Sequence, residues 1–89
     1  MYPRLYTGFK HGIGPSGVPL MDQDLVALNG IYLLASDTNN SPVYIGDTDV
    51  VSRGMPLSSG DFISIPVRHP AEIMVCSSGL NQKINWVLT

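Results

Sequence analysis

The sequence carries little charge, and this shortage limits the partners that the chain can bind. Charged residues make up 13% of the 89 residues, and the formal net charge is −2. The five lysines and arginines are scattered along the chain, as Arg4, Lys10, Arg53, Arg68 and Lys83. Because they form no basic stripe that could follow a phosphate backbone, nucleic acid is not an expected partner.

Cysteine is scarcer still, since Cys76 is the only one and no disulfide can form within the chain. The two histidines, His11 and His69, do not combine with it in the spacing of a zinc site. A chain of this size buries only about 60–65% of the surface that its unfolded form exposes. In a chain of this length the stabilisation from apolar burial is nearly cancelled by the entropy lost when the chain becomes ordered. With neither disulfide, metal nor cofactor expected, a partner subunit or a larger surface is the remaining source of stability.

Long apolar runs are missing as well. The longest ones fall far short of the ~20 residues that cross a bilayer, so no membrane segment is predicted. The start, Met1–Arg4, lacks the apolar stretch of a secretory signal. Together with the single cysteine, this predicts synthesis in a reducing cytoplasm.

The first 24 residues are rich in glycine and proline and keep no sustained period of 2 or 3.6. Proline lacks the N–H of a strand ladder, and glycine loses the most freedom on ordering. We expect residues 1–24 to form an extended arm outside the folded domain, either frayed or ordered on a neighbouring subunit. The residues expected to contact a partner are its aromatic and apolar side chains: Tyr2, Tyr6, Phe9, Ile13, Val18 and Leu20.

Residues 25–89 carry the signals of a single all-β domain. About six short antiparallel strands separated by turn residues are typical of a small β-sandwich or barrel. Alternation and turn residues place strands at 30–36, 42–46, 61–67, 71–77 and 82–88. Asn29-Gly30 is either a hairpin turn after a strand at 26–28 or a bulge in one longer strand. Residues 47–60 are predicted to be loop-rich.

Two of these strands have features that predict their place in a sheet. Pro66 lies within the run 61–67 and favours an edge position or a strand end. The run 71–77 is apolar on both faces apart from Glu72, as suits a central strand. Trp86 alternates with Ile84 and Leu88 and is therefore expected in the core.

Residues with catalytic potential are few, and each has a structural explanation. Cys76 falls in an apolar strand, where cysteine behaves as a small hydrophobe. His69 precedes Pro70 in a turn, where a histidine side chain is expected to be exposed to solvent and to have no catalytic role. Asp47 and Asp49 could converge on calcium, but the later ligands of an EF-hand loop are missing, so a solvated or capping role is favoured. No nucleophile elbow or phosphate-binding loop occurs, and we predict that the chain is not an enzyme.

The segment Val43 to Gly60 has a recognisable pattern. Val43-Tyr44-Ile45-Gly46 is followed by a polar loop and then by Gly54-Met-Pro-Leu57-Ser-Ser-Gly60. This pattern resembles small β-domain proteins of tailed-phage virions, and the likeness extends over about residues 30–88. It implies a structural role for Gly46, Gly54 and Gly60 as tight turns and for Leu57 as a core residue. It carries over no catalytic or metal-binding residue.

Two functions follow from this likeness. The leading one is a structural virion protein, a capsid decoration (cement) protein that binds the major capsid protein or another virion protein. It would act as a small homo-oligomer, with a trimer favoured. The alternative is a receptor- or glycan-binding module of a head or tail fibre, with Tyr32, Tyr44 and the loop 47–54 as its site.

Overall fold

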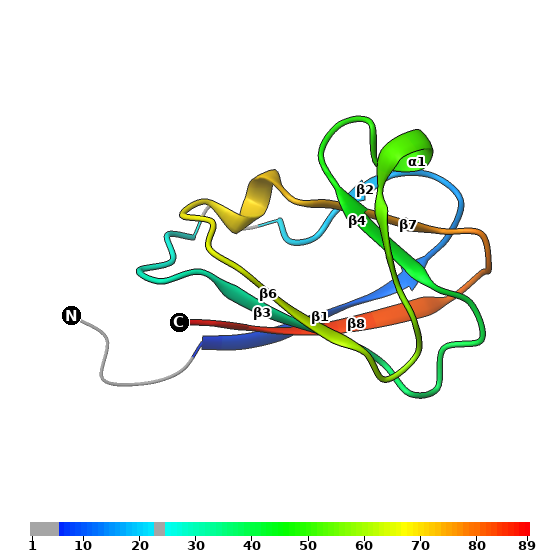
Figure 1. The fold of residues 1–89 in the computed structure, drawn as a ribbon, viewed down its shortest axis with the longest axis horizontal. Helices are drawn as coiled ribbons and strands as arrows, with labels where there is room; N and C mark the ends of the chain where they lie inside the picture. The colour runs from blue at the N-terminus through cyan, green and yellow to red at the C-terminus, as the bar shows by residue number, and fades with distance from the viewer. Residues whose placement is uncertain (1–5, 23–24) are drawn as a thin grey trace.

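The computed structural model describes residues 6–22 and 25–89, which form two antiparallel four-stranded sheets (Figure 1). The first sheet has the order β1-β8-β3-β6, with strands Tyr6–Ile13, Gln82–Leu88, Ile31–Ala35 and Phe62–Ile65. The second has the order β2-β7-β4-β5, with strands Val18–Pro19, Met74–Ser77, Val43–Gly46 and Met55–Leu57. A helical turn α1 (Val50–Arg53) and a 3-10 turn η1 (Pro70–Glu72) complete the described elements. The predicted all-β class is confirmed, with eight strands in place of about six.

The core lies between the two sheets and is filled from alternate positions of their strands. In β3 and β8 every second side chain is buried, as a strand with one face on a core requires. Trp86 is among these buried residues, as its alternation predicted. The other inward side chains of the largest strands are Ile31, Leu33, Ala35, Val43, Ile45, Val75, Ile84 and Leu88.

The expectation of a separate arm over residues 1–24 is wrong for the part that the structure describes. Residues 6–13 form β1, which pairs with β8 from Tyr6 to Lys10 and again at Ile13, and residues 18–19 form β2, which pairs with β7. Ile13, Leu20 and Met21 are buried in the core. The folded domain therefore includes the segment that was expected to lie outside it, and Tyr2 falls outside the described residues.

Strand β1 lacks the alternation of apolar and polar residues that usually identifies a strand in a sequence. The inward positions opposite Trp86 and Ile84 are occupied by Gly8 and Lys10, neither of which gives an apolar signal. The Trp86 indole supplies the missing bulk. A Cβ atom on Gly8 would overlap Cζ2 of that ring and lie 2.8 Å from Cε2. The strand pattern is thus completed by a side chain 78 positions later in the sequence, which no local reading could include.

The strands expected after residue 29 are present, with shifted bounds. Strand β6 is an edge strand that ends just before Pro66, and β7 is central in its sheet, as predicted. Residues 71–72 belong to η1 and not to the strand. Asn29-Gly30 makes neither a hairpin nor a bulge, because residues 26–28 form no strand. Gly30 has a φ of 140° and approaches Pro66 so closely that a Cβ would lie 2.9 Å from its Cα.

The glycines of the Val43–Gly60 pattern have different roles. Gly60 has a φ of 81°, so a turn does require glycine there. Gly54 has an ordinary φ of −66°, but a Cβ on it would lie 2.6 Å from the carbonyl oxygen of Val50. Gly46 has neither a positive φ nor a contact closer than 3.4 Å, so its predicted tight turn is not seen. Leu57 is buried in the core, as expected.

A buried amide ties the β3–β4 connection to the start of β8. The Gln82 side chain accepts hydrogen bonds from the N–H groups of Asn40 (3.0 Å) and Ser41 (3.1 Å) and donates to Asn40 Oδ1 (2.8 Å). The Asn39 amide pairs with the backbone of Lys83 in both directions, at 2.8 Å each. These charge-free bonds hold a turn-rich segment in place, and an unsatisfied buried partner would destabilise the fold by about 1–3 kcal/mol.

The contact between Gly8 and Trp86 makes a direct prediction about stability. Gly8→Ala should lower the free energy of unfolding by about 1–3 kcal/mol, because the new methyl group displaces the indole. Gly14→Ala is the matched control, since its Cβ would meet nothing closer than 3.6 Å. Urea unfolding followed by tryptophan fluorescence measures both variants. Equal stability of the two would contradict the packing described.

Candidate functional site

The strand register places eight side chains in two rows across the solvent side of the first sheet. Residues paired directly opposite each other project to the same face. One row follows the pairs Phe9↔Asn85, Leu34↔Asn85 and Leu34↔Phe62, and the other follows Thr7↔Val87, Tyr32↔Val87 and Tyr32↔Ser64. We call these eight residues the outer face: Thr7, Phe9, Tyr32, Leu34, Phe62, Ser64, Asn85 and Val87.

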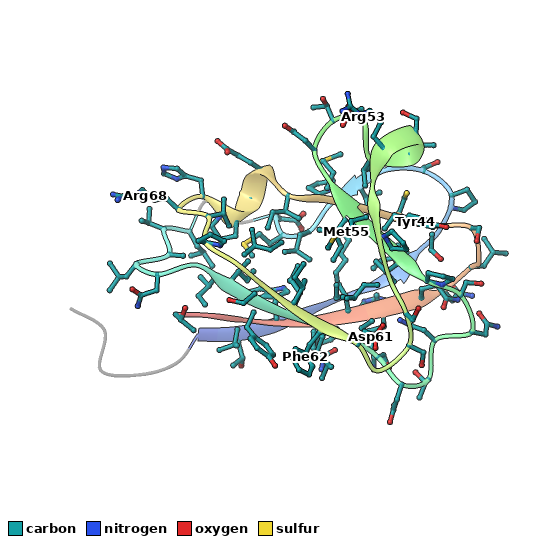
Figure 2. All side chains as sticks on the ribbon, in the orientation of Figure 1. Tyr44, Arg53, Met55, Asp61, Phe62 and Arg68 are labelled. Carbon is teal, nitrogen blue, oxygen red and sulfur yellow. The ribbon has the colours of Figure 1, made fainter. Side chains whose placement is uncertain are left out.

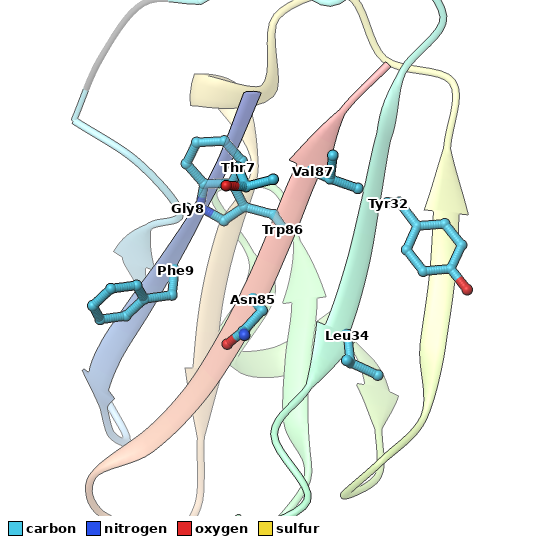
Figure 3. A pocket seen from close by; sticks show the side chains of 8 residues that line it. All are labelled: Thr7, Gly8, Phe9, Tyr32, Leu34, Asn85, Trp86 and Val87. Carbon is cyan, nitrogen blue, oxygen red and sulfur yellow. The ribbon is translucent and has the colours of Figure 1, made fainter. Parts of the chain in front are cut away.

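The outer face is aromatic and open. Phe9 is 61% exposed and Phe62 is 62% exposed, and they end the same row on opposite edges of the sheet. The Tyr32 and Phe62 rings stack with their centroids 5.3 Å apart. Between Phe9 and Tyr32 lies a shallow hollow of about 380 Å³, with Asn85 among its lining residues (Figure 3). Exposed aromatic side chains grouped in this way are typical of contact surfaces.

None of the eight residues of the outer face carries a charge. With strands about 4.8 Å apart, each row extends over about 14 Å from the first strand to the fourth. A surface of this kind selects a partner by shape and apolar contact and not by charge pairing.

The second sheet differs because α1 packs on part of its outer side, against β4 and β7 (Figure 1). Val50 of α1 is buried, and the sulfur of Cys76 lies 3.8 Å from the Val50 carbonyl oxygen. Both residues are buried but separate from the main core between the sheets. The chain therefore covers part of the outer side of the second sheet with α1, whereas the outer face of the first sheet exposes Phe9 and Phe62.

The two tyrosines expected to share a glycan site lie on different sheets. Tyr32 belongs to β3 in the first sheet and projects outward there, whereas Tyr44 belongs to β4 in the second. Figure 2 shows Phe62 and Tyr44 on different sides of the sandwich. The structure does not bring Tyr32, Tyr44 and the loop 47–54 together, so that version of the site is wrong. Tyr32 is instead grouped with Phe62.

The residues expected to contact a partner from an arm are divided by the structure. Phe9 is exposed on the outer face, whereas Ile13 and Leu20 are buried in the core and Val18 packs against it. Tyr6 begins β1. Of the described side chains in that set, Phe9 is the one positioned for a partner. Neither Phe62 nor Leu34 was predicted as a contact residue from the sequence, although the alternation of β3 and β6 places both on the face opposite their less exposed neighbours.

The residues considered for catalysis and metal binding do not gather. Among the described residues no three His, Cys, Asp or Glu side chains lie close enough to hold a metal ion. Asp47 accepts a hydrogen bond from the Thr48 N–H at 2.7 Å, and Asp49 forms an exposed ion pair with Arg53 at 3.6 Å. Both carboxylates thus have local structural partners, as the loop interpretation predicted. No helix in the described ranges is long and apolar enough to cross a membrane.

Comparison with known proteins adds no relative to this picture: no family model, no curated protein and no solved structure matches the chain.

The buried position of Cys76 makes a prediction about thiol reactivity. Burial raises the pKa of the Cys76 thiol above its ordinary value of 9.0, so the folded state holds the reactive thiolate at a lower level. At pH 8 the folded protein should react with a disulfide reagent at least about tenfold more slowly than the urea-unfolded chain. Equal rates would contradict the burial.

The raised pKa of Cys76 also predicts how the stability of the fold depends on pH. Because the pKa of this thiol is higher in the folded state than in the unfolded chain, its contribution to stability is fully present below the unfolded pKa. That contribution is lost as the pH rises through the folded pKa. The free energy of unfolding should therefore fall above about pH 9, and Cys76→Ala should remove part of that fall.

Proposed function

We propose that this chain is a non-catalytic structural protein of a tailed-phage virion, a capsid decoration protein that binds the shell through its outer face. The observation that carries the proposal is the contrast between the two sheets. The chain packs α1 on part of the outer side of the second sheet and leaves the uncharged, aromatic outer face exposed on the first. Its partner would be the major capsid protein or another protein of the virion, which is where the chain would reside after synthesis in the host cytoplasm.

The physical role of such contacts is to add buried area across the joints of the shell. Burying a phenylalanine or leucine side chain stabilises a contact by about 1.5–3 kcal/mol, before the losses of association are counted. Phe9, Leu34 and Phe62 form one row, so a partner that covers the row gains from all of them at once. Expansion of the shell or internal pressure would then have to break these contacts.

The sequence resemblance supports the same role, and the residues of its defining pattern lie together in one part of the fold. The Val43–Gly60 pattern builds β4, α1 and β5, which are the elements that form one half of the second sheet and its cover. Its glycine and leucine positions hold this unit together and contribute nothing to the outer face. The resemblance therefore supports a shared scaffold, and the outer face is the part that would select a partner.

The alternative, a glycan- or receptor-binding module of a fibre, is favoured by one observation. Asn85 lies between Phe9 and Leu34 in the row, and its amide is placed to bond a sugar hydroxyl while the rings of the outer face stack on the sugar. A glycan array probed with the purified chain tests this alternative separately from capsid binding.

Capsid binding makes a prediction that separates the outer face from other exposed apolar residues. Phe62→Ser should weaken co-sedimentation of the purified chain with particles that lack it by at least about tenfold, or about 1.4 kcal/mol. The matched control is Val51→Ser on α1, which is 66% exposed but lies away from the outer face. It should bind like the unaltered chain.

Electron microscopy of the virion tests the decoration role directly. Density for this chain absent from the shell would contradict the decoration role. Equal losses for Phe62→Ser and Val51→Ser would contradict the outer face as the contact. Binding to defined glycans, lost in Phe62→Ser and independent of capsids, would favour the fibre module instead.

A further inference from the structure

Strand β1 is a sheet edge with open backbone groups, and the local hydrogen bonds identify them. In an antiparallel sheet the N–H and C=O of one residue point to the same neighbour, and successive residues alternate between the two sides. The N–H of Thr89 donates to the Gly30 carbonyl at 2.9 Å, and the N–H of Ser36 donates to the Lys83 carbonyl at 3.1 Å. The odd-numbered residues of β8 therefore face β3 with their backbone groups.

It follows that the even-numbered residues of β8 face β1. Ile84, Trp86 and Leu88 are opposite Lys10, Gly8 and Tyr6 in the register, and these pairs exchange the ladder bonds. The residues between them, Thr7 and Phe9, point their N–H and C=O groups away from the sheet. No hydrogen bond of the described chain engages these groups. Figure 3 shows β1 as the outermost strand beside β8.

The other three edges of the sandwich are blunted. Strand β2 has two residues and ends in Pro19, β5 has three residues with Pro56 at its centre, and β6 has four residues followed by Pro66. Short length and proline are the devices that prevent one edge strand from pairing with another. Strand β1 has eight residues and no proline. Its regular pairing lasts from Tyr6 to Lys10, after which the register shifts before Ile13.

We propose that β1 pairs antiparallel with β1 of a second copy of this chain, with the two-fold axis at Gly8. This proposal does not rest on the virion role. In that register Thr7 of each copy lies opposite Phe9 of the other, and their outward N–H and C=O groups form four hydrogen bonds.

The sequence of β1 is self-complementary in this register. Gly8 meets Gly8 of the second copy at the axis, where the Cα atoms of such a pair approach to about 4.5 Å and the absent side chain removes any clash. The two Lys10 residues lie at opposite ends of the paired segment, so like charges are not opposed. Residue parity is preserved, and the outer faces of the two copies therefore join into one surface that crosses eight strands.

The proposed pairing also limits the assembly to two copies. Each copy offers one open edge of this length among its described strands, and a two-fold contact uses the same edge of both copies. Association therefore stops at a dimer and does not continue into a fibre.

Thr7→Pro tests the proposal at a single backbone atom. Proline removes the outward N–H of residue 7 and fills its place with a ring, while β1 keeps its hydrogen bonds to β8. Sedimentation velocity of the full chain from low micromolar to millimolar concentration should show a concentration-dependent dimer. Thr7→Pro should be monomeric throughout that range. Thr7→Val keeps the N–H and should form the dimer as the unaltered chain does.

Circular dichroism and thermal unfolding of Thr7→Pro at low micromolar concentration show whether the monomer is still folded. If it is not, Phe9→Pro is the second variant, since it removes the other outward N–H. A chain that is monomeric at every concentration, a trimer, or a dimer that persists in a folded Thr7→Pro or Phe9→Pro protein would overturn the proposal.

Discussion

Pairing of the first strand with the last is the contact on which the rest of the structure depends. Strand β8 lies between β1 and β3, and it is the longest strand of its sheet after β1. Its Trp86 side chain lies across Gly8, and that contact requires glycine because any Cβ would overlap the indole. The chain has one cysteine and a small core, so no covalent bond can take over if this closure is lost. The N-terminal glycines are therefore part of the fold and not of a separate arm.

The same closure explains why the molecule has two unlike surfaces. In the first sheet the Trp86 side chain projects into the core, and the outward side chains include Phe9, Tyr32, Leu34 and Phe62. Part of the second sheet is covered by α1, whose Val50 contacts the region of Gly46 and Gly54. The aromatic row without charge on the first sheet is the surface on which the proposed contact with a partner rests. Both the capsid proposal and the glycan alternative now use this row, and Tyr44 belongs to neither.

Prediction from sequence succeeded where the signal was local. Strands β3, β6 and β8 alternate more buried and more exposed side chains along their own length, and Pro66 follows the end of β6, where a proline is expected to end a strand. Prediction failed at β1, because Gly8 and Lys10 occupy the inward positions and the sequence therefore shows no alternation of apolar and polar residues there. It also failed at Asn29-Gly30, where the positive φ serves a close approach to Pro66 in place of a hairpin. The candidate site followed the same division: Tyr32 and Phe9 were noticed, but their grouping with Phe62 was not.

By itself, then, the sequence determined the all-β class, the lack of a disulfide within the chain, the inward position of Trp86 and the low content of charge. These are properties of composition and of period along one strand. Only the tertiary structure decided that Tyr6–Ile13 is a strand, that Tyr32 and Tyr44 are on different sheets, and that α1 packs on part of the outer side of the second sheet. The physical reason is that each of these facts depends on contacts between residues far apart in the chain. A glycine becomes a strand residue when a distant indole fills its space, and a tyrosine becomes part of a surface when register places a phenylalanine beside it.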